Sequence, residues 1–345
     1  MRRYFFNIIS SGLLLTALYP SQYLLAEEIN PLSLLQRMQQ SNQAVNYEGR
    51  YVYFNGQRLD TLQIYRSVDG DLERERIQHL SGKPAEVIKS GDKLDCYHPN
   101  DKVTQLSLTN NKQEFVAPGS DRRFGNLDVL SEHYQLNYVG IDRVADRSAH
   151  QVRMIPRDQV RYGHSLWLDD DSGLLLKLVT ADNKGRMLEM FEFVSLSLRE
   201  TIPVEKFQPN PQLTRVLLKE SAGSGVDPLS LIRGKEDTAE VPSNWSIAWM
   251  PSGFQRSNLS LQASGANAAG TRIYTDGISA FSLFFAPIAE VNAVPPATRQ
   301  GATMAVSRIV EKPQASTKSR YMLTVVGEIP LSTGQQVIES FRWTD

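Results

Sequence analysis

Cysteine is almost absent from this chain of 345 residues, because Cys96 is its only one. A single cysteine cannot form an internal disulfide, so the folded protein has to be stabilised by its hydrophobic core. We interpret Cys96 as a small apolar residue in a strand beside Tyr97; a reactive or intermolecular thiol is the alternative. No cysteine stands directly after the N-terminal apolar segment, which argues against a lipid-anchored lipoprotein.

The chain also lacks a strong charge of either sign. Its formal net charge is −1, and it becomes −3 without residues 1–26, which contain Arg2 and Arg3 and no acidic residue. Proteins that bind nucleic acid need a basic surface. A nucleic-acid partner is therefore not expected.

A long apolar run is missing as well. A membrane-spanning helix takes about 20 apolar residues, whereas the run from Phe5 to Leu18 is shorter and is interrupted by polar residues. Two arginines precede this run, and Ala26 offers a small residue after it. This pattern predicts that residues 1–26 are a signal peptide cleaved near Ala26 and that the protein is exported. A transmembrane anchor is the less favoured alternative.

Catalytic and metal-binding patterns are not found. The five histidines are scattered without metal-ligand spacing, and no Gly-x-Ser-x-Gly motif is present. The run Asp169-Asp170-Asp171 lacks the spaced ligands and terminal glutamate of a calcium loop, so it predicts a polar hairpin turn. We expect no catalytic residue, no metal and no cofactor, and a binding protein rather than an enzyme such as a hydrolase.

The most informative stretch runs from Asn46 to Pro99. It predicts five short strands joined by tight turns, one of them at Asn55-Gly56, after a helix that starts at Pro31 with Asn30 as its N-cap. The charged run from Glu73 to Arg76 is interpreted as a solvated strand face with cross-strand ion pairs. Such a meander without catalytic groups favours a binding function.

Proline, glycine and serine mark a boundary in the second half of the chain. We predict an N-terminal domain over 27–215, a linker over 216–241 and a C-terminal domain over 242–345. The N-terminal domain continues with strands at 103–108, 134–144, 149–156, 165–168, 174–180 and 187–197 and a short helix at 126–133. The C-terminal domain has predicted strands at 245–250, 259–263, 271–276, 279–285, 301–310 and 321–327, an exposed loop at 287–300 and a final helix at 330–341.

An antiparallel sheet of this size must cover its apolar face or use it. Residues 27–200 offer only one or two helices, so we expect an incompletely covered curved sheet whose hollow is a ligand pocket. A plain core position is the alternative for each candidate. The candidates to line the pocket are Tyr51, Tyr53, Ile64, Phe115, Phe124, Trp167, Met190 and Phe191.

Sequence blocks in both halves carry a resemblance to a known family. They are NYEGRYVY at 46–53, ERER at 73–76 with LSG at 80–82, EVI at 86–88, CYHP at 96–99, YTDG at 274–277 followed by 279–284, RQGA at 299–302 and VVGEIP at 325–330. In these blocks the chain resembles the RseB/MucB family, in order and over nearly the whole mature chain.

The resemblance implies an α+β fold. The N-terminal domain would resemble the lipoprotein carriers of the outer-membrane pathway, which are antiparallel half-barrels closed by helices. The C-terminal domain would be a smaller α/β sandwich-type domain.

The resemblance also implies a function, because members of the family are periplasmic negative regulators of the envelope-stress sigma factor. They bind the periplasmic part of a membrane-spanning anti-sigma factor, shield it from regulated proteolysis and release it when lipid or lipopolysaccharide binds. We take exposed aromatic and arginine side chains as the anchors for this partner, and the candidates are Arg272, Tyr274, Phe281 and Phe284.

A periplasmic lipid or lipoprotein carrier is the alternative function. The linked C-terminal domain disfavours it, because a carrier needs only the N-terminal half. The identity of the lipid signal, homo-oligomerisation and the relative orientation of the domains stay open. As a mechanism, we expect ligand entry into the N-terminal pocket to change the placement of the two domains.

Overall fold

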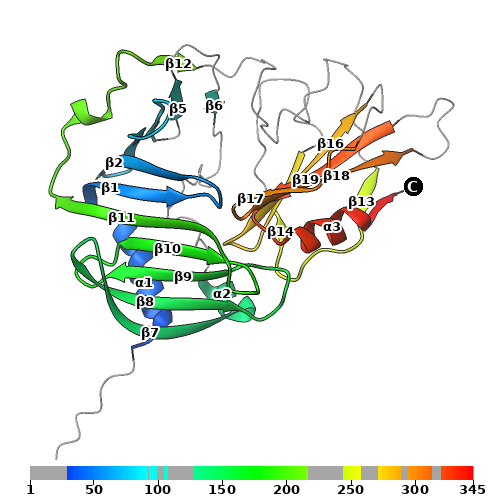
Figure 1. Cartoon of the computed structure of the whole chain (residues 1–345), viewed down its shortest axis with the longest axis horizontal. Coiled ribbons are helices and arrows are strands. Elements are labelled where there is room, and N and C mark those ends of the chain that lie inside the picture. The colour runs from blue at the N-terminus through cyan, green and yellow to red at the C-terminus, as the bar shows by residue number, and fades with distance from the viewer. Residues whose placement is uncertain are drawn as a thin grey trace, which may run out of the picture.

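The computed structural model describes residues 29–91, 93–98, 105–107, 127–216, 244–257, 271–288, 294–312 and 320–344. Within these ranges, it holds a 12-stranded sheet, a six-stranded sheet and a two-stranded pair. Figure 1 shows the large sheet and the smaller one side by side. The predicted signal peptide, the pocket candidates Phe115 and Phe124 and the strand expected at 259–263 lie outside the described residues, as does nearly all of the linker.

Helix α1 (Pro31–Asn42) begins where the sequence predicts it. The side-chain oxygen of Asn30 accepts a hydrogen bond from the backbone N–H of Leu32 at 2.9 Å, and proline occupies the first helical position. Leu35 and Met38 are completely buried. The helix packs across one face of the large sheet, which we call the helix face (Figure 1). Helix α2 (Leu127–His133) contributes to the same core.

The large sheet is an antiparallel meander that the chain leaves and re-enters. Its strand order is β12-β5-β4-β3-β2-β1-β11-β10-β9-β8-β7, with β6 paired to β5. The five-strand meander expected between residues 46 and 99 is confirmed as β1 to β5. The strands are β1 (Asn46–Phe54), β2 (Leu59–Asp69), β3 (Leu72–His79), β4 (Glu86–Ser90), β5 (Lys93–His98), β6 (Gln105–Ser107), β7 (Tyr134–Val144), β8 (Arg147–Pro156), β9 (Gly163–Asp169), β10 (Leu175–Ala181), β11 (Met187–Arg199) and β12 (Thr214–Val216).

The charged run from Glu73 to Arg76 lies on β3, and its interpretation as a solvated strand face was wrong. Its cross-strand ion pairs are present, but the strand is not solvated, since Arg76 is only 8% exposed. Arg76 and the buried Glu86 on β4 are joined by hydrogen bonds of 2.9 to 3.2 Å. On the helix face, Arg66 pairs with Glu73 and Glu75 and is itself buried.

A segment from far along the chain buries the outer face of β3 and β4. The short 3₁₀ helix η2 (Val204–Phe207) lies there. The carbonyl of Lys206 accepts a hydrogen bond from Arg76 at 2.9 Å, and the backbone N–H of Asn210 donates to Glu86 at 3.1 Å. Both partners of the buried ion pair therefore bond to this segment. The sequence could not indicate that this segment covers β3 and β4, because the segment lies about 130 positions from β3 along the chain.

The turn between β9 and β10 is confirmed as a polar hairpin turn. Arg147 donates to both carboxylate oxygens of Asp169, at 2.7 and 2.8 Å, and Ser172 donates to the same carboxylate. The side chain of Asp170 contacts His150 instead. Asp171 also accepts a hydrogen bond from Arg147, at 3.1 Å, so all three aspartate side chains contact protein partners.

Cys96 lies half-buried in β5, where burial raises the pKa of its thiol. This placement agrees with the expectation of a small residue within a strand.

The C-terminal sheet has the order β14-β15-β16-β19-β18-β17, and helix α3 packs against β18 and β19 on one of its faces. The loop expected at 287–300 contains the short edge strand β17, and the final helix ends at Glu339, before a last strand. The elements are β13 (Trp245–Ile247), β14 (Gln255–Arg256), β15 (Thr271–Thr275), β16 (Ala280–Pro287), β17 (Thr298–Gln300), β18 (Thr303–Glu311), β19 (Arg320–Gly327), α3 (Leu331–Glu339) and β20 (Phe341–Trp343).

Aromatic rings form much of the C-terminal core. Phe285 stacks on Trp245 at 5.2 Å between ring centroids and on Tyr321 at 4.9 Å. Phe341 and Trp343 of β20 also contact Phe285, both at 5.8 Å. Because β13 pairs with β20, the first and last strands of this domain meet around the same ring.

Candidate binding site between the two domains

The pocket candidates predicted from the sequence do not share one face. Tyr51, Tyr53, Ile64 and Phe191 point to the helix face, because Tyr51 pairs with Leu62 of β2 and Tyr53 with Phe191 of β11. Met190 and Trp167 are neighbours of helix-face residues within their strands and therefore point to the opposite face. The prediction that Trp167 and Met190 line the same hollow was wrong.

Trp167 has partners on that outer face. Its indole N–H donates to Asp142 at 2.9 Å, and the ammonium group of Lys177 lies 4.8 Å from the ring centroid. The error arose because an aromatic residue in a buried strand signals burial but not the side on which it is buried.

Tyr51 is the deepest of the helix-face candidates, at 1% exposure. Its ring packs edge-on against Phe191 at 4.9 Å and Phe193 at 5.9 Å, so aromatic packing fills this part of the core. Its hydroxyl has no hydrogen-bond partner among the described residues. Burial raises the pKa of Tyr51 well above the usual value for tyrosine.

The four partner candidates on the C-terminal sheet also divide between two faces. Phe281 is a core residue at 1% exposure, which corrects the prediction of an exposed anchor. The rings of Tyr274 and Phe281 stack with their centroids 5.4 Å apart. The guanidinium carbon of Arg272 lies 3.4 Å from the ring centroid of Trp245. Phe284 is on the other face, because adjacent residues of β16 alternate. These four residues therefore form no continuous surface.

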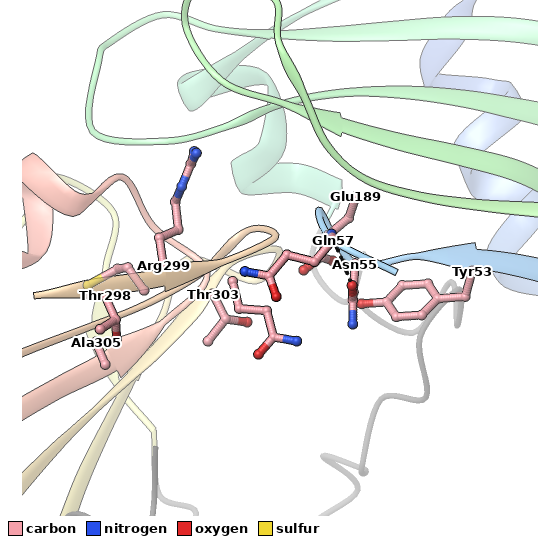
Figure 2. A pocket seen from close by; sticks show the side chains of 10 residues that line it. Tyr53, Asn55, Gln57, Glu189, Thr298, Arg299, Thr303 and Ala305 are labelled. Carbon is pink, nitrogen blue, oxygen red and sulfur yellow. Dashed lines mark hydrogen bonds between the residues drawn. The ribbon is translucent and has the colours of Figure 1, made fainter. Parts of the chain in front are cut away.

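A pocket of about 510 Å³ lies at the junction of the two domains. Figure 2 shows side chains from the N-terminal domain, among them Asn55, Gln57 and Glu189, facing Thr303 and Ala305 of the C-terminal domain. Among the predicted pocket residues that the structure describes, Tyr53 is the one that lines it. The lining residues are Tyr53, Asn55, Gln57, Glu189, Thr298, Arg299, Gln300, Thr303, Met304 and Ala305.

Two tight turns bring the domains together beside this pocket. The Asn55-Gly56 turn follows β1, and Gly301 lies in the turn between β17 and β18. Both glycines have positive φ, and a Cβ atom at Gly301 would lie only 2.5 Å from a carboxylate oxygen of Glu189 and 2.8 Å from the carbonyl of Asn55. Glycine at this position permits the close approach, and the backbone N–H of Ala302 then donates to Glu189 at 2.9 Å.

Six of the ten residues that line the pocket have uncharged polar side chains. Thr298 and Gln300 share a face of the β17–β18 hairpin with Ala305 and Thr303, their cross-strand partners. From the other domain come the hydroxyl of Tyr53 and the amide of Asn55. Hydroxyl and amide groups both donate and accept hydrogen bonds, so this lining suits a ligand rich in amide or hydroxyl groups.

The most buried polar contact of the junction is centred on Arg161, in the loop between β8 and β9. Its Nε donates to Asp276 of the C-terminal domain at 2.7 Å, and the two side chains are 0% and 1% exposed. Arg161 also contacts Asp158, the carbonyl of Ser252 and the ring of Phe254, which lies 5.3 Å from its guanidinium carbon. Three of its four partners thus belong to the other domain.

Residues beside Arg161 extend this junction. The hydroxyl of Tyr162 donates to the carbonyl of Ile329 at 3.0 Å, and Thr333 of α3 donates to the carbonyl of Val160 at 3.2 Å. Burial raises the pKa of Tyr162 to about 12. Tyr162 also forms a small apolar cluster with Leu188 and Ala302.

The turns at this junction carry local sequence signals, but their contact with the other domain does not. Asn55-Gly56 is a hairpin signal, and Asp276-Gly277 and Arg299 to Ala302 lie in blocks that carry the family resemblance. Arg161 carried no signal, because a single arginine in a loop is indistinguishable from a solvated one. Tyr53 and the resemblance block at 299–302 are the sequence predictions that fall on the pocket.

Other types of site receive no support from the described residues. Among them, no group of three or more histidine, cysteine, aspartate or glutamate side chains is placed to hold a metal ion. Within the same part of the chain, no helix combines the length and apolar character that crossing a bilayer requires.

Comparison with known families assigns both domains. The family model described as the MucB/RseB N-terminal domain matches residues 30–211. The model described as the MucB/RseB C-terminal domain matches residues 239–342. Together these two models span most of the chain.

Individual relatives agree with this assignment. The sigma-E factor regulatory protein RseB of Haemophilus influenzae is 26% identical over 340 residues, which cover 98% of each chain. The sigma factor AlgU regulatory protein MucB of Pseudomonas aeruginosa is 28% identical over 313 residues, or 89% of each chain.

Solved structures share the fold. The MucA/MucB complex of Pseudomonas aeruginosa contains a chain that is 25% identical, with a TM-score of 0.66 over 92% of this chain and 100% of that one. A crystal structure of MucB matches with 24% identity and a TM-score of 0.60, over 90% of this chain and 97% of that one. The predicted α+β fold, with a large antiparallel sheet and a smaller C-terminal domain, is confirmed.

Proposed function

The chain belongs to the MucB/RseB family, and we propose that it is a periplasmic regulator that binds the periplasmic part of a membrane-spanning anti-sigma factor. The observation that carries this proposal is the match of both domains, in order, to a family whose relative MucB is known in complex with MucA. Another structure of MucB is described as a complex with MucA(peri). Export of this chain, predicted from residues 1–26, would bring it to the same compartment as such a segment.

The pocket between the domains is the binding site that we infer for this partner. It combines side chains from both domains, and its hydroxyl and amide groups match the donors and acceptors of a peptide backbone. A segment seated there would contact the β1–β2 turn and the β17–β18 hairpin at once. Binding across two domains fits a regulator whose affinity depends on their relative placement.

Restraint of the stress response would follow from this binding. A bound anti-sigma segment is less accessible to a protease, so the regulator would protect it until a signal releases it. We infer that lipid or lipopolysaccharide is that signal and that it acts through the N-terminal domain. The chain thus acts by binding rather than by catalysis, in agreement with the regulatory names of its relatives.

Calorimetric titration tests the proposal. The chain without residues 1–26 is titrated with the periplasmic segment of the anti-sigma factor from the same organism, alone and with a lipid A-like ligand present. We expect micromolar or tighter binding, which corresponds to about −8 kcal/mol or better, and weaker binding with the lipid. A folded chain that shows no binding would reject the proposed function.

Variants locate the site within the same experiment. Gln300→Ala with Thr303→Ala removes two polar side chains from the pocket and should weaken binding about tenfold, or about 1.4 kcal/mol. Gln335→Ala, on the exposed side of α3, is the matched control and should leave the affinity unchanged. Equal affinities for all three chains would place the partner elsewhere.

A further inference from the structure

We propose that Arg161 and the β15–β16 turn form a latch that fixes the two domains relative to each other, and that the pocket between the domains exists only while this latch is closed. This inference concerns the regulation of the proposed binding site, and its binding part rests on the proposed function. Its structural part concerns this chain alone.

The turn that Arg161 holds is inserted into the N-terminal domain. Asp276 and Ile278 belong to the C-terminal domain, yet Ile278 is part of the hydrophobic core that underlies the large sheet. Tyr134 of β7 belongs to the same core, and burial and the nearby carboxylate of Asp276 both raise the pKa of this tyrosine. Arg161 therefore secures an element of one domain within the core of the other.

Asp276 has two separate tasks in this turn. Its Oδ1 accepts hydrogen bonds from the backbone N–H groups of Ile278 at 3.0 Å and Ser279 at 2.8 Å, which shape the turn. Its Oδ2 accepts from Arg161. One carboxylate thus couples the local turn to the other domain, and the two tasks fall on different oxygen atoms.

The chemistry of the junction allows the latch to open without unfolding either domain. Apart from Ile278, the apolar cluster across the described junction contains only Tyr162, Leu188 and Ala302, while the two domain cores are otherwise separate. Domains joined by small, polar interfaces move relative to each other unless something holds them. Water can rehydrate Arg161 and Asp276 when the domains part, which offsets part of the lost attraction.

Opening would divide the pocket, because Tyr53, Asn55, Gln57 and Glu189 would separate from the lining residues of β17 and β18. A partner that contacts both groups would favour the closed latch. By linkage, the factor by which the bound partner favours the closed latch is also the factor by which the closed latch favours partner binding. Anything that opens the latch would therefore weaken the partner's binding. The latch therefore gives the inferred release of the anti-sigma segment a physical basis.

Pulsed electron paramagnetic resonance can measure the placement of the domains directly. Spin labels at Asn183→Cys in the β10–β11 turn and Gln335→Cys on α3 occupy exposed positions of the two domains. The chain prepared for labelling lacks residues 1–26 and also carries Cys96→Ser, so that the two introduced cysteines are the only labelled sites. We expect one narrow distance distribution for this parent chain.

Asp276→Asn is the test variant, because asparagine keeps the acceptor oxygen of the turn but loses the charge that Arg161 needs. This variant should broaden the distribution of distances between the two spin labels and add longer distances to it. Asp169→Asn removes a similar arginine partner within the N-terminal domain and is the matched control, which should keep the parent distribution. Arg161→Met removes the other side of the latch and should reproduce the effect of Asp276→Asn.

Binding of the anti-sigma segment completes the test. If opening reduces the closed fraction to about one tenth, the apparent affinity of Asp276→Asn should fall about tenfold. Parent-like distances in folded Asp276→Asn and Arg161→Met would overturn the latch, even if the partner binds the parent chain. Altered distances with no partner binding to the parent would support the latch and reject the proposed function. Altered distances with unchanged affinity would overturn the coupling of the latch to the pocket.

Discussion

The two domains stabilise their sheets with different chemistry. In the large sheet, charged side chains are buried on both faces of β3 and β4, as in the pair between Arg76 and Glu86. In the C-terminal domain, stacked aromatic rings surround Phe285. An ion pair within the described part of the C-terminal sheet, between Arg320 and Glu311, is by contrast exposed.

This difference teaches how each domain connects distant parts of its chain. In the N-terminal domain, a buried ion pair between neighbouring strands is completed by the segment around Lys206 and Asn210. In the C-terminal domain, β13 and β20 meet through rings and hydrophobic contact. Buried charges demand complete pairing, whereas aromatic packing tolerates substitution by other apolar side chains.

The largest effect is expected from breaking the buried ion pair. Glu86→Ala would leave Arg76 without its carboxylate and should lower the free energy of unfolding by about 3–5 kcal/mol. Hydrogen exchange followed by mass spectrometry should show faster exchange in β3 to β5 and unchanged exchange in the C-terminal sheet.

The double variant Arg76→Met with Glu86→Leu is the control for this prediction. It replaces both charges with apolar side chains of similar size, and it should recover most of the lost stability. If the double variant is no more stable than Glu86→Ala, the cost arises from other contacts of Glu86, such as that with Gln78.

A smaller effect is expected from the aromatic core. Phe285→Leu keeps an apolar side chain of similar volume but loses ring contacts, so unfolding free energy should fall by about 1–2 kcal/mol. Denaturation followed by tryptophan fluorescence measures this change. Phe284→Leu, on the other face of the same strand, is the control and should have the weaker effect. A loss as large as that of Glu86→Ala would remove the contrast between the domains.

The smallest effect is a pH dependence within the N-terminal domain. Burial raises the pKa of Asp169, but the hydrogen bonds from Arg147 and Ser172 outweigh it and hold the pKa below its ordinary value of 3.8. The stabilisation by this pair is therefore present at neutral pH and is lost as the pH falls below about 4.

Asp169→Asn should remove this pH dependence. The difference in unfolding free energy between the parent and Asp169→Asn should be about 1 kcal/mol, since asparagine keeps an acceptor oxygen for these hydrogen bonds and loses only the charge. It should shrink as the pH falls from 7 to 3 in urea titrations. A difference that is constant over this range would show that hydrogen bonding rather than charge stabilises the turn.

Local sequence signals predicted the local structure well. The cap at Asn30 and the turn at Asn55-Gly56 each depend on one or two residues and their neighbours, and both are present. Strand positions in the meander also followed from alternation. These features could be predicted because their physical cause lies within a few residues.

The errors share a different cause. The sequence shows that a strand has two faces, but it does not show what covers each one. Arg76 is buried by a segment about 130 positions away, and Trp167 is buried on the side opposite to Phe191. The candidate site could not be predicted either, because its residues converge from two domains. Only the family resemblance pointed to the turn that contains Gly301.

The position of Ile278 sets a limit on how this protein can be divided for study. The chain separates into two parts along its length, but the side chain of Ile278 completes a core that the other part builds. An N-terminal fragment made alone would have a hole there and an arginine with most of its partners removed. Experiments on single domains would therefore describe a surface that the whole protein never exposes with its latch closed.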